Sequence, residues 1–386
     1  MLSGGTLQAW FASENTSLMT IGLLSLVTQP YIYKFIWAPF LDRYIPPVLG
    51  RRRGWIFFMQ LLLAVTLVMM GLYGHPRTHA IELAVLALFL SFFSATQDIS
   101  IDAYRTDILQ PSEWGIASAF YVTTYRIAII ASGGLALIFA DHYGWKETYF
   151  LMAAIMMLMG IVTLLSPEPK IIQAPTTLKQ AMSEPIKEFI SRPYYKWALC
   201  FLFFYKFGDA FTISLSSAFL IKHLHYSLSI VGSVNKIIGV ISAILGGLVG
   251  GFLFKKLGLY RALLYFGFGQ ALCSFLFMIQ ALVGQNIGML ILTVFADNFL
   301  GGMSTVAFLA YITSICNKKT SAAQFALFSA ISSLPRVFIG PIAALTIEWI
   351  GWPSFFFVSF FLSLPGLWLL WSARNSYDAF CIQSQE

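Results

Sequence analysis

Long apolar stretches recur along this 386-residue chain, and they restrict its possible folds more than any other feature. A helix that crosses the hydrocarbon core of a bilayer needs about 20 apolar residues. Eleven full spans are predicted, at 20–40, 55–73, 81–101, 117–140, 149–165, 197–221, 227–254, 263–283, 287–313, 325–347 and 355–371. Only 11% of the residues are charged, against about 25% in a soluble domain. The sequence therefore predicts an all-α polytopic membrane protein, and it excludes a soluble enzyme, a nucleic-acid-binding protein and a disordered chain.

The first apolar stretch is shorter than the others. Residues 2–12 are followed by Glu14, so this stretch covers about half of a span at 1.5 Å per residue. We expect a first helix that is truncated in the chain as written, with further apolar residues encoded upstream.

Lysine and arginine concentrate in alternate loops, for example at 51–53, 166–193 and 255–261, whereas the opposite loops hold only Arg77, Lys146 and Lys222. The positive-inside rule places the first set in the cytoplasm. Within 166–193 apolar residues recur every fourth position, which predicts a short amphipathic helix on the membrane surface, with a flexible linker as the alternative. These residues are Leu178, Met182, Ile186 and Ile190.

An internal repeat relates the two halves of the chain. Ala103–Tyr104 matches Ala310–Tyr311, and Gly144–Trp145 matches Gly351–Trp352, each pair displaced by 207 positions. Equal displacement of parallel halves implies two pseudo-symmetric six-helix bundles, the major facilitator fold. The predicted domains are an N-terminal bundle at 1–165, a cytoplasmic linker at 166–195, a C-terminal bundle at 196–373 and a polar tail at 374–386.

Charged residues inside the predicted spans are the candidate functional groups, because each costs roughly 2.5 to 3.5 kcal/mol on insertion scales. Asp98, Asp102 and Arg105 share one helical face at i, i+4 and i+7. Lys206 and Asp209 form a second candidate pair at i, i+3. Such groups line a water-filled cavity or form structural ion pairs between helices, and both readings stay open for these two sets.

The source of energy follows from what the sequence lacks. It contains no G-x-x-x-x-G-K-[ST] phosphate loop and no soluble segment long enough for an ATPase domain. A transporter built from this chain would therefore use an ion gradient. A membrane-embedded enzyme is the competing class, but the five histidines are scattered over loops, and the four cysteines show no paired spacing. We predict no enzymatic activity, no cofactor and no metal site.

Several motifs together resemble the AmpG family of muropeptide permeases, within the major facilitator superfamily. They are Gly5–Trp10, KFIWAPFLDRY at 34–44, LGRRRGW at 49–55, ATQDISIDAYRTDIL at 95–109, TTYRIAIIASGGLAL at 123–137, YKFGDAF at 205–211, VNKIIG at 234–239, CNKKTSAAQFALFSA at 316–330 and RVFIGP at 336–341. The resemblance runs from Gly5 to about Phe357. The superfamily's basic turn is recognisable in Asp42–Arg43 and Gly50–Arg52, with four extra residues at 45–48 and Pro39 near the expected glycine.

The resemblance implies import of GlcNAc-1,6-anhydro-MurNAc and its peptides across the bacterial inner membrane, by proton symport, for peptidoglycan recycling. We expect a monomer among membrane lipids whose other partners are the substrate and protons. Peptide carboxylates and sugar groups suit basic and amide side chains. The predicted substrate-binding residues are Arg126, Arg336, Lys206, Lys236, Gln97 and Asn298. The predicted proton-coupling residues are Asp98, Asp102, Arg105 and Asp209. The predicted gate residues are Asp42, Arg43 and Arg52.

Two alternatives stay open. The acetyl-CoA transporter family shares several of these motifs, so the chain could carry another anionic metabolite. A non-transporting receptor derived from a permease belongs to a different functional class, and the short first stretch is compatible with it.

Overall fold

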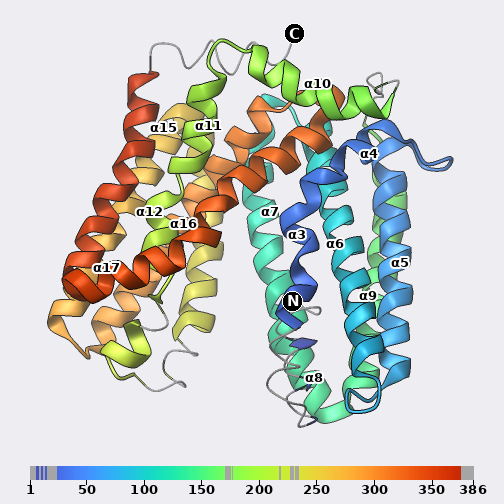
Figure 1. Ribbon diagram of the computed structural model, residues 1–386, viewed down its shortest axis with the longest axis horizontal. Helices are drawn as coiled ribbons and strands as arrows, with labels where there is room; N and C mark the ends of the chain where they lie inside the picture. Colours follow the sequence, from blue (N-terminus) through green and yellow to red (C-terminus); the bar gives the residue numbers. More distant parts are fainter. Residues whose placement is uncertain are drawn as a thin grey trace. The chain divides into compact units, whose positions relative to one another are not determined.

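The computed structural model describes residues 6–7, 10–11, 14, 24–169, 175, 177–216, 219–226, 230 and 234–374, and every regular element in these residues is helical (Figure 1). The first part contains η1 (Leu24–Thr28), α3 (Pro30–Tyr33), η2 (Lys34–Ile36), α4 (Ala38–Arg43), α5 (Arg51–Tyr73), α6 (Ala80–Ile108), η3 (Pro111–Glu113), α7 (Trp114–Ile129), η4 (Ile130–Leu135), α8 (Ala136–Tyr143) and α9 (Trp145–Leu165). The remainder contains α10 (Leu178–Ser191), α11 (Tyr195–Phe204), α12 (Phe207–Ile213), η5 (Phe219–His223), η6 (Val234–Ile238), α15 (Gly239–Val283), α16 (Ile287–Ile315), η7 (Lys318–Thr320) and α17 (Ser321–Ser372).

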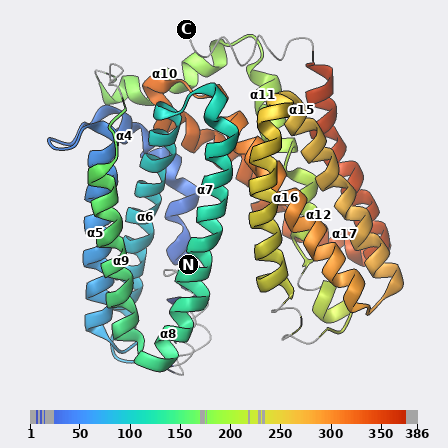
Figure 2. The ribbon, with the colours of Figure 1, turned by 180° about the vertical axis from the view of Figure 1, so that it is seen from behind.

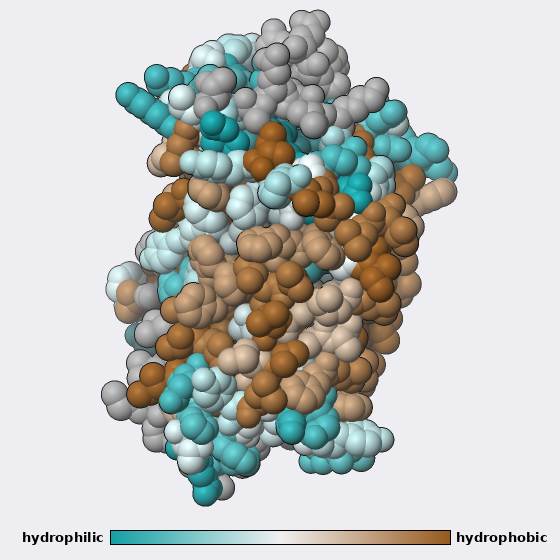
Figure 3. Space-filling view, turned by 90° about the vertical axis from the view of Figure 1, so that its right-hand side faces the viewer, coloured by the Kyte–Doolittle hydropathy of each residue, from teal (hydrophilic) through white to brown (hydrophobic). Residues whose placement is uncertain are grey.

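Seven helical stretches of the described residues are long and apolar enough to cross a membrane. They are Arg51–Tyr73, Ala80–Ile108, Pro111–Tyr143, Trp145–Leu165, Gly239–Val283, Ile287–Ile315 and Leu345–Ser372. Helices α5, α6 and α9 lie side by side, and the face that they present carries a band of apolar residues between hydrophilic ends (Figures 1 and 3). Phe58 and Val65 of α5 and Leu158 and Ile161 of α9 are exposed there. A water-facing surface would not carry such a band, so the chain is a multi-pass membrane protein.

Helix α17 contains two predicted spans, α15 contains the end of one and all of the next, and each helix turns sharply between its two spans. Gly258 (φ 72°, ψ 169°) interrupts α15, and Gly351 (φ 73°, ψ 170°) interrupts α17. Gly144 has nearly the same conformation (φ 95°, ψ 164°) before α9, as does Gly50 (φ 81°, ψ −171°) before α5. This combination of positive φ and extended ψ is adopted almost exclusively by glycine. The repeat seen in the sequence thus reappears in the backbone, because Gly144 and Gly351 are the positions 207 residues apart.

Two of the eleven predicted spans are interrupted helices rather than continuous ones. Residues 24–40 form η1, α3, η2 and the start of α4, because Pro30 and Pro39 lack the N–H that a continuing helix requires. The span at 197–221 breaks at Lys206, whose backbone leaves the helical region (φ −102°, ψ 6°). Interrupted helices are tolerated at membrane depth where they line a cavity or are buried in protein.

The amphipathic helix predicted in the central linker is confirmed as α10. Its apolar stripe, which includes Leu178 and Met182, is exposed, whereas Ala181 and Phe189 on another face are buried. Phe189 packs against Phe328 with ring centroids 4.7 Å apart. The helix is therefore held by small and aromatic residues outside the predicted stripe, and its position on the membrane surface stays a prediction.

Two compact units make up the structure, and each combines segments from distant parts of the sequence. The first unit comprises Met1–Ile108, Ile127–Lys187 and Cys316–Leu327, and the second comprises Leu109–Arg126, Glu188–Ile315 and Phe328–Glu386. The predicted division into bundles at 1–165 and 196–373 stays a prediction.

Each unit has an apolar core. In the first, Trp10 stacks on Trp145 with ring centroids 5.5 Å apart and packs at a tilt against Tyr149 at 5.0 Å, among buried residues of α5, α6 and α9. In the second, Phe211, Phe219, Phe277, Phe355 and Phe356 form the centre. Helices α15 and α16 pack along one another (Figure 2), and a Cβ atom at Gly246 would lie 1.9 Å from the Phe299 carbonyl oxygen. This close packing brings Gln270 of α15 within hydrogen-bond distance of Asp297 of α16.

Candidate functional site

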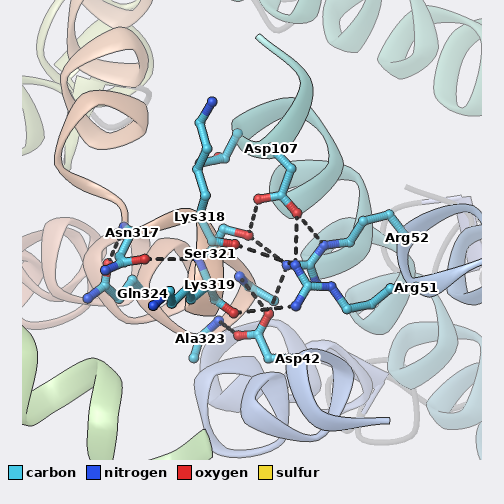
Figure 4. A network of polar contacts seen from close by, with 12 residues as sticks. Asp42, Arg51, Arg52, Asp107, Asn317, Lys318, Lys319, Ser321, Ala323 and Gln324 are labelled. Carbon is cyan, nitrogen blue, oxygen red and sulfur yellow. Dashed lines mark hydrogen bonds and ion pairs between the residues drawn. The ribbon is translucent and has the colours of Figure 1, made fainter. Parts of the chain in front are cut away.

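A network of ion pairs occupies the turn between α4 and α5 in the first unit (Figure 4). Arg52 donates from its Nη2 to Asp42 Oδ1 at 2.9 Å and from its Nε to Asp107 Oδ2 at 2.7 Å. Arg51 Nη2 lies 3.4 Å from the same Asp107 oxygen. All four side chains are almost fully buried. Two carboxylates thus balance two guanidinium groups away from water.

The same network holds the N-terminus of α17. The backbone N–H groups of Ala322 and Ala323 donate to Asp42 at 3.4 and 2.9 Å, and Ser321 Oγ donates to Asp107 Oδ1 at 2.6 Å. A carboxylate suits the first turn of a helix because the unpaired N–H groups and the helix dipole are both positive there. Burial raises the pKa of the Asp42 carboxyl, and the neighbouring Arg52 guanidinium opposes that rise.

The predicted gate residues are only partly brought together. Asp42 and Arg52 are in direct contact, whereas Arg43 lies half-buried with its guanidinium over the Tyr44 ring, 5.5 Å from the centroid. Sequence reasoning missed the roles of Asp107 and Ser321, because neither belongs to the basic turn and Ser321 is 269 positions from Arg52.

A second charged cluster lies on α6 of the same unit. Lys34 Nζ lies 2.5 Å from Asp98 Oδ2 and 3.8 Å from Asp102 Oδ2. Asp102 Oδ1 also accepts from Arg105 Nη2 at 3.5 Å, and the Arg105 guanidinium lies 5.2 Å from the Phe325 ring centroid. Two acidic side chains are therefore paired with two basic ones. We call these four residues, Lys34, Asp98, Asp102 and Arg105, the Lys34 cluster.

Lys34 is located in η2, where the predicted first span is interrupted. A lone lysine inside an apolar stretch is the sequence signal that could have identified Lys34 as the partner of Asp98 and Asp102. Gln97, a predicted substrate contact, is half-buried on α6 in the same unit.

A cavity of about 590 Å³ opens in the second unit, and we call it the Lys206 pocket. Its polar lining residues are Arg126, Lys206, Asp209, Ser216, Gln270, Asp297, Asn298, Thr305, Ser329, Ser332 and Ser333. Apolar lining comes from residues such as Phe277 and Phe308. The volume falls within the range of about 300–1,000 Å³ typical of small-molecule sites.

Lys206 occupies the break between α11 and α12, and its ammonium reaches α16. The Nζ atom lies 3.1 Å from Ser304 Oγ, 3.5 Å from Thr305 Oγ1 and 3.9 Å from Asp209 Oδ2. On another side of the break, the backbone of α12 approaches α17 closely because residue 208 is a glycine. A Cβ atom there would lie 1.9 Å from Ser363 Oγ. The predicted pair Lys206–Asp209 is therefore formed, although the contact is long and the lysine is shared with two hydroxyl groups.

Two aspartates of the pocket are joined by one amide. Gln270 Nε2 donates to Asp209 Oδ1 at 3.1 Å and to Asp297 Oδ1 at 3.0 Å. These residues come from α12, α15 and α16. Asp209 and Asp297 are both recognisable in the sequence as acids inside predicted spans, whereas Gln270 is not, because an uncharged glutamine gives no signal of its own in an apolar helix.

The predicted substrate-binding residues are distributed as follows. Arg126, Lys206 and Asn298 line the pocket together, and Asn298 Nδ2 donates to the Val294 carbonyl at 2.9 Å. The backbone of Arg336 lies in α17 and that of Lys236 in η6, but their side chains lie outside the described residues. The site therefore combines two cations, two linked carboxylates, two amides and several hydroxyl groups, which suits a polar ligand with anionic groups.

Comparison with known proteins gives concordant results. The family model described as Major Facilitator Superfamily matches residues 2–295. The anhydromuropeptide permease of Escherichia coli K12 is 43% identical over 379 residues, which are 98% of this chain and 77% of the permease. "Putative transporter AmpG 1" of Rickettsia bellii is 31% identical over 389 residues, covering 97% of this chain and 94% of the relative.

Solved structures agree on the fold. FucP in the outward conformation matches with a TM-score of 0.67 at 13% identity, over 96% of each chain. The proton:xylose symporter XylE also matches with a TM-score of 0.67, at 12% identity, over 95% of this chain and 90% of its own. Both are described as major facilitator superfamily proteins.

Proposed function

The chain belongs to the major facilitator superfamily, and from this premise we propose that it imports GlcNAc-1,6-anhydro-MurNAc and its peptides across the bacterial inner membrane. The proposed transporter is non-enzymatic, works as a monomer, couples import to protons and serves peptidoglycan recycling. The observation that carries the proposal is the 43% identity, over almost the whole chain, to a relative named anhydromuropeptide permease.

The composition of the Lys206 pocket supports this substrate class. Anhydromuropeptides combine peptide carboxylates with sugar hydroxyl and N-acetyl groups. Arg126 and Lys206 supply positive charge, Asn298 supplies an amide, and Thr305 supplies a hydroxyl on the same wall. Phe308 offers an aromatic face on which a sugar ring can pack. Arg336, Lys236 and Gln97 remain proposed substrate contacts.

Two readings compete for the acidic residues. The ion pairs of Asp98 and Asp102 with Lys34 and Arg105 support a structural role for the Lys34 cluster. Asp209, which lines the pocket and has a weaker lysine contact, is the better supported of the predicted proton-coupling residues.

The network around Asp42 supports a gate. Arg52 and Asp42 tie the turn before α5 to the first turn of α17, so release of one helix requires several buried contacts to break together. We propose that Asp42 and Arg52, together with Asp107, stabilise one state of the transport cycle.

Uptake into proteoliposomes tests the proposed function. Purified protein should accumulate labelled GlcNAc-1,6-anhydro-MurNAc when the external medium is made acidic, and a protonophore should abolish accumulation. Unlabelled anhydromuropeptide should compete, whereas acetyl-CoA should not. Specific binding without any uptake would favour the receptor, and competition by acetyl-CoA would favour the carrier of another anionic metabolite.

A further inference from the structure

We propose that Asp297 and Asp209, joined by Gln270, hold the transported proton between them, and that the anionic substrate promotes this protonation by drawing Lys206 away. The inference rests on the proposed function, and it adds Asp297 and Gln270 to the coupling machinery. It locates coupling inside the substrate pocket itself.

The first argument is the geometry of the amide. A glutamine Nε2 carries two hydrogens, and here one points to each carboxylate, at 3.1 and 3.0 Å. The amide therefore holds the two acids on either side of a single nitrogen, in the lining of the Lys206 pocket. It contributes hydrogen bonds to both but no net charge to balance them.

The second argument is the balance of charge around the pair. Lys206 Nζ is 3.9 Å from Asp209 Oδ2, which is a long contact for an ion pair, and this one lysine acts on both acids. Two ionised carboxylates that share a site with one lysine repel each other, and the addition of one proton removes that repulsion. Other groups that face the pair or the pocket are Tyr205, Cys273 and Arg126.

The third argument is that Lys206 has divided interactions. Its ammonium contacts Ser304 and Thr305 as well as Asp209, so no single partner fixes it. A carboxylate of the substrate that enters the pocket competes with Asp209 for this ammonium. When the substrate takes Lys206, the acid pair loses its nearest cation and gains a proton on a carboxylate oxygen. Release of the substrate returns Lys206 to Asp209, and the proton leaves.

The coupling test compares two measurements on Asp297→Asn in proteoliposomes with the membrane potential clamped. The first is exchange of labelled for unlabelled anhydromuropeptide at equal pH, which needs no net proton movement. The second is net accumulation under a pH gradient of one unit, which allows about tenfold accumulation at one proton per substrate. We expect exchange to persist and accumulation to fall to the equilibrium level, because Asn keeps the hydrogen-bonding shape but cannot carry the proton.

The controls separate the possible failures. Glu348→Gln removes an exposed carboxylate from the same unit and should leave both measurements unchanged. Loss of exchange in Asp297→Asn, with the protein folded, would make Asp297 a substrate contact and overturn the proposal. Full accumulation by that variant would overturn it too. Absence of exchange in the unaltered protein would instead refute the proposed function.

A second variant and readout cover a failure to fold. Asp209→Asn should show the same separation of exchange from accumulation. In weakly buffered detergent solution the unaltered protein should take up protons when substrate is added, and either variant should not. Proton uptake that persists in both variants would mean that the transported proton binds to a group other than Asp209 and Asp297, and it would overturn the proposal.

Discussion

The Lys34 cluster of the first unit and the Lys206 pocket of the second contain similar charged residues but balance them differently. In the cluster, Lys34 and Arg105 pair directly with Asp98 and Asp102. In the pocket, Asp209 and Asp297 share the neutral amide of Gln270 and one long lysine contact. Direct ion pairs favour the ionised carboxylate, whereas an amide bridge leaves a charge that a proton can neutralise. From this difference in partners we expect a structural role for the acids of the Lys34 cluster and a transport role for those of the Lys206 pocket.

The largest expected effect is that of Lys34→Met. Removal of the ammonium leaves two carboxylates near each other with only Arg105 to balance them. Asp102 is buried but Asp98 is 34% exposed, so we expect a cost of about 3 kcal/mol, at the lower end for a buried pair. We expect loss of folded protein from the membrane, measured by size-exclusion chromatography of detergent extracts. The double variant Lys34→Met with Asp98→Asn should recover part of the folded protein. A normal yield of folded Lys34→Met would contradict a structural role for the ion pairs of the Lys34 cluster.

The next largest effects are expected for two arginine-to-lysine substitutions, one in the Lys206 pocket and one in the Lys34 cluster. Arg126→Lys keeps the charge in the pocket but loses the planar fork that binds carboxylates, so we expect uptake to fall about tenfold with little change in thermal stability. Arg105→Lys is the matched control in the Lys34 cluster, and it should lower thermal stability more than uptake. Equal uptake by both variants would place recognition of the substrate carboxylate elsewhere.

The next smaller effect is expected for Asp98→Asn. Lys34 then keeps Asp102 at 3.8 Å, so the loss is about 1 to 3 kcal/mol of stability, with the ratio of accumulation to exchange unchanged. Thermal unfolding followed by both transport measurements tests this. A selective loss of accumulation would return proton coupling to Asp98, as the sequence alone suggests.

The smallest expected effect is that of Ser304→Ala. It removes the hydroxyl that lies 3.1 Å from Lys206, which should lower stability by about 1 kcal/mol and leave exchange intact. The same substitution at Ser100, whose hydroxyl donates to the Thr96 carbonyl on its own helix, is the control on the other unit. A loss of exchange in Ser304→Ala alone would mean that the hydroxyl contacts the substrate directly.

The features that the sequence predicted well are the local ones. The membrane class, the amphipathic helix α10, and the close pair Lys206–Asp209 follow from composition, from a four-residue period and from i, i+3 spacing. The breaks at Pro30 and Lys206 were missed because an apolar stretch reads as one helix whether or not its backbone is continuous.

The partners that decide the chemistry are distant in sequence. Gln270 lies 61 positions from Asp209, and Ser321 lies 214 positions from Asp107. Glu168 is another example, because its carboxylate accepts the backbone N–H groups of Arg52 and Arg53 from more than 100 positions away. Periodicity carries no information about such contacts, since they depend on how whole helices pack.

The turn at Gly351 has a mechanical consequence for the two arms of α17. Consecutive Cα atoms are 3.8 Å apart, so a connection made by one residue has no slack. The arms cannot slide past each other, and any axial displacement of one is transmitted in full to the other. What stays free is rotation about the Gly351 torsions, where a Cβ atom would meet nothing within 4 Å. We therefore expect the two arms of α17 to change their mutual angle at Gly351 rather than their offset along the helix axis.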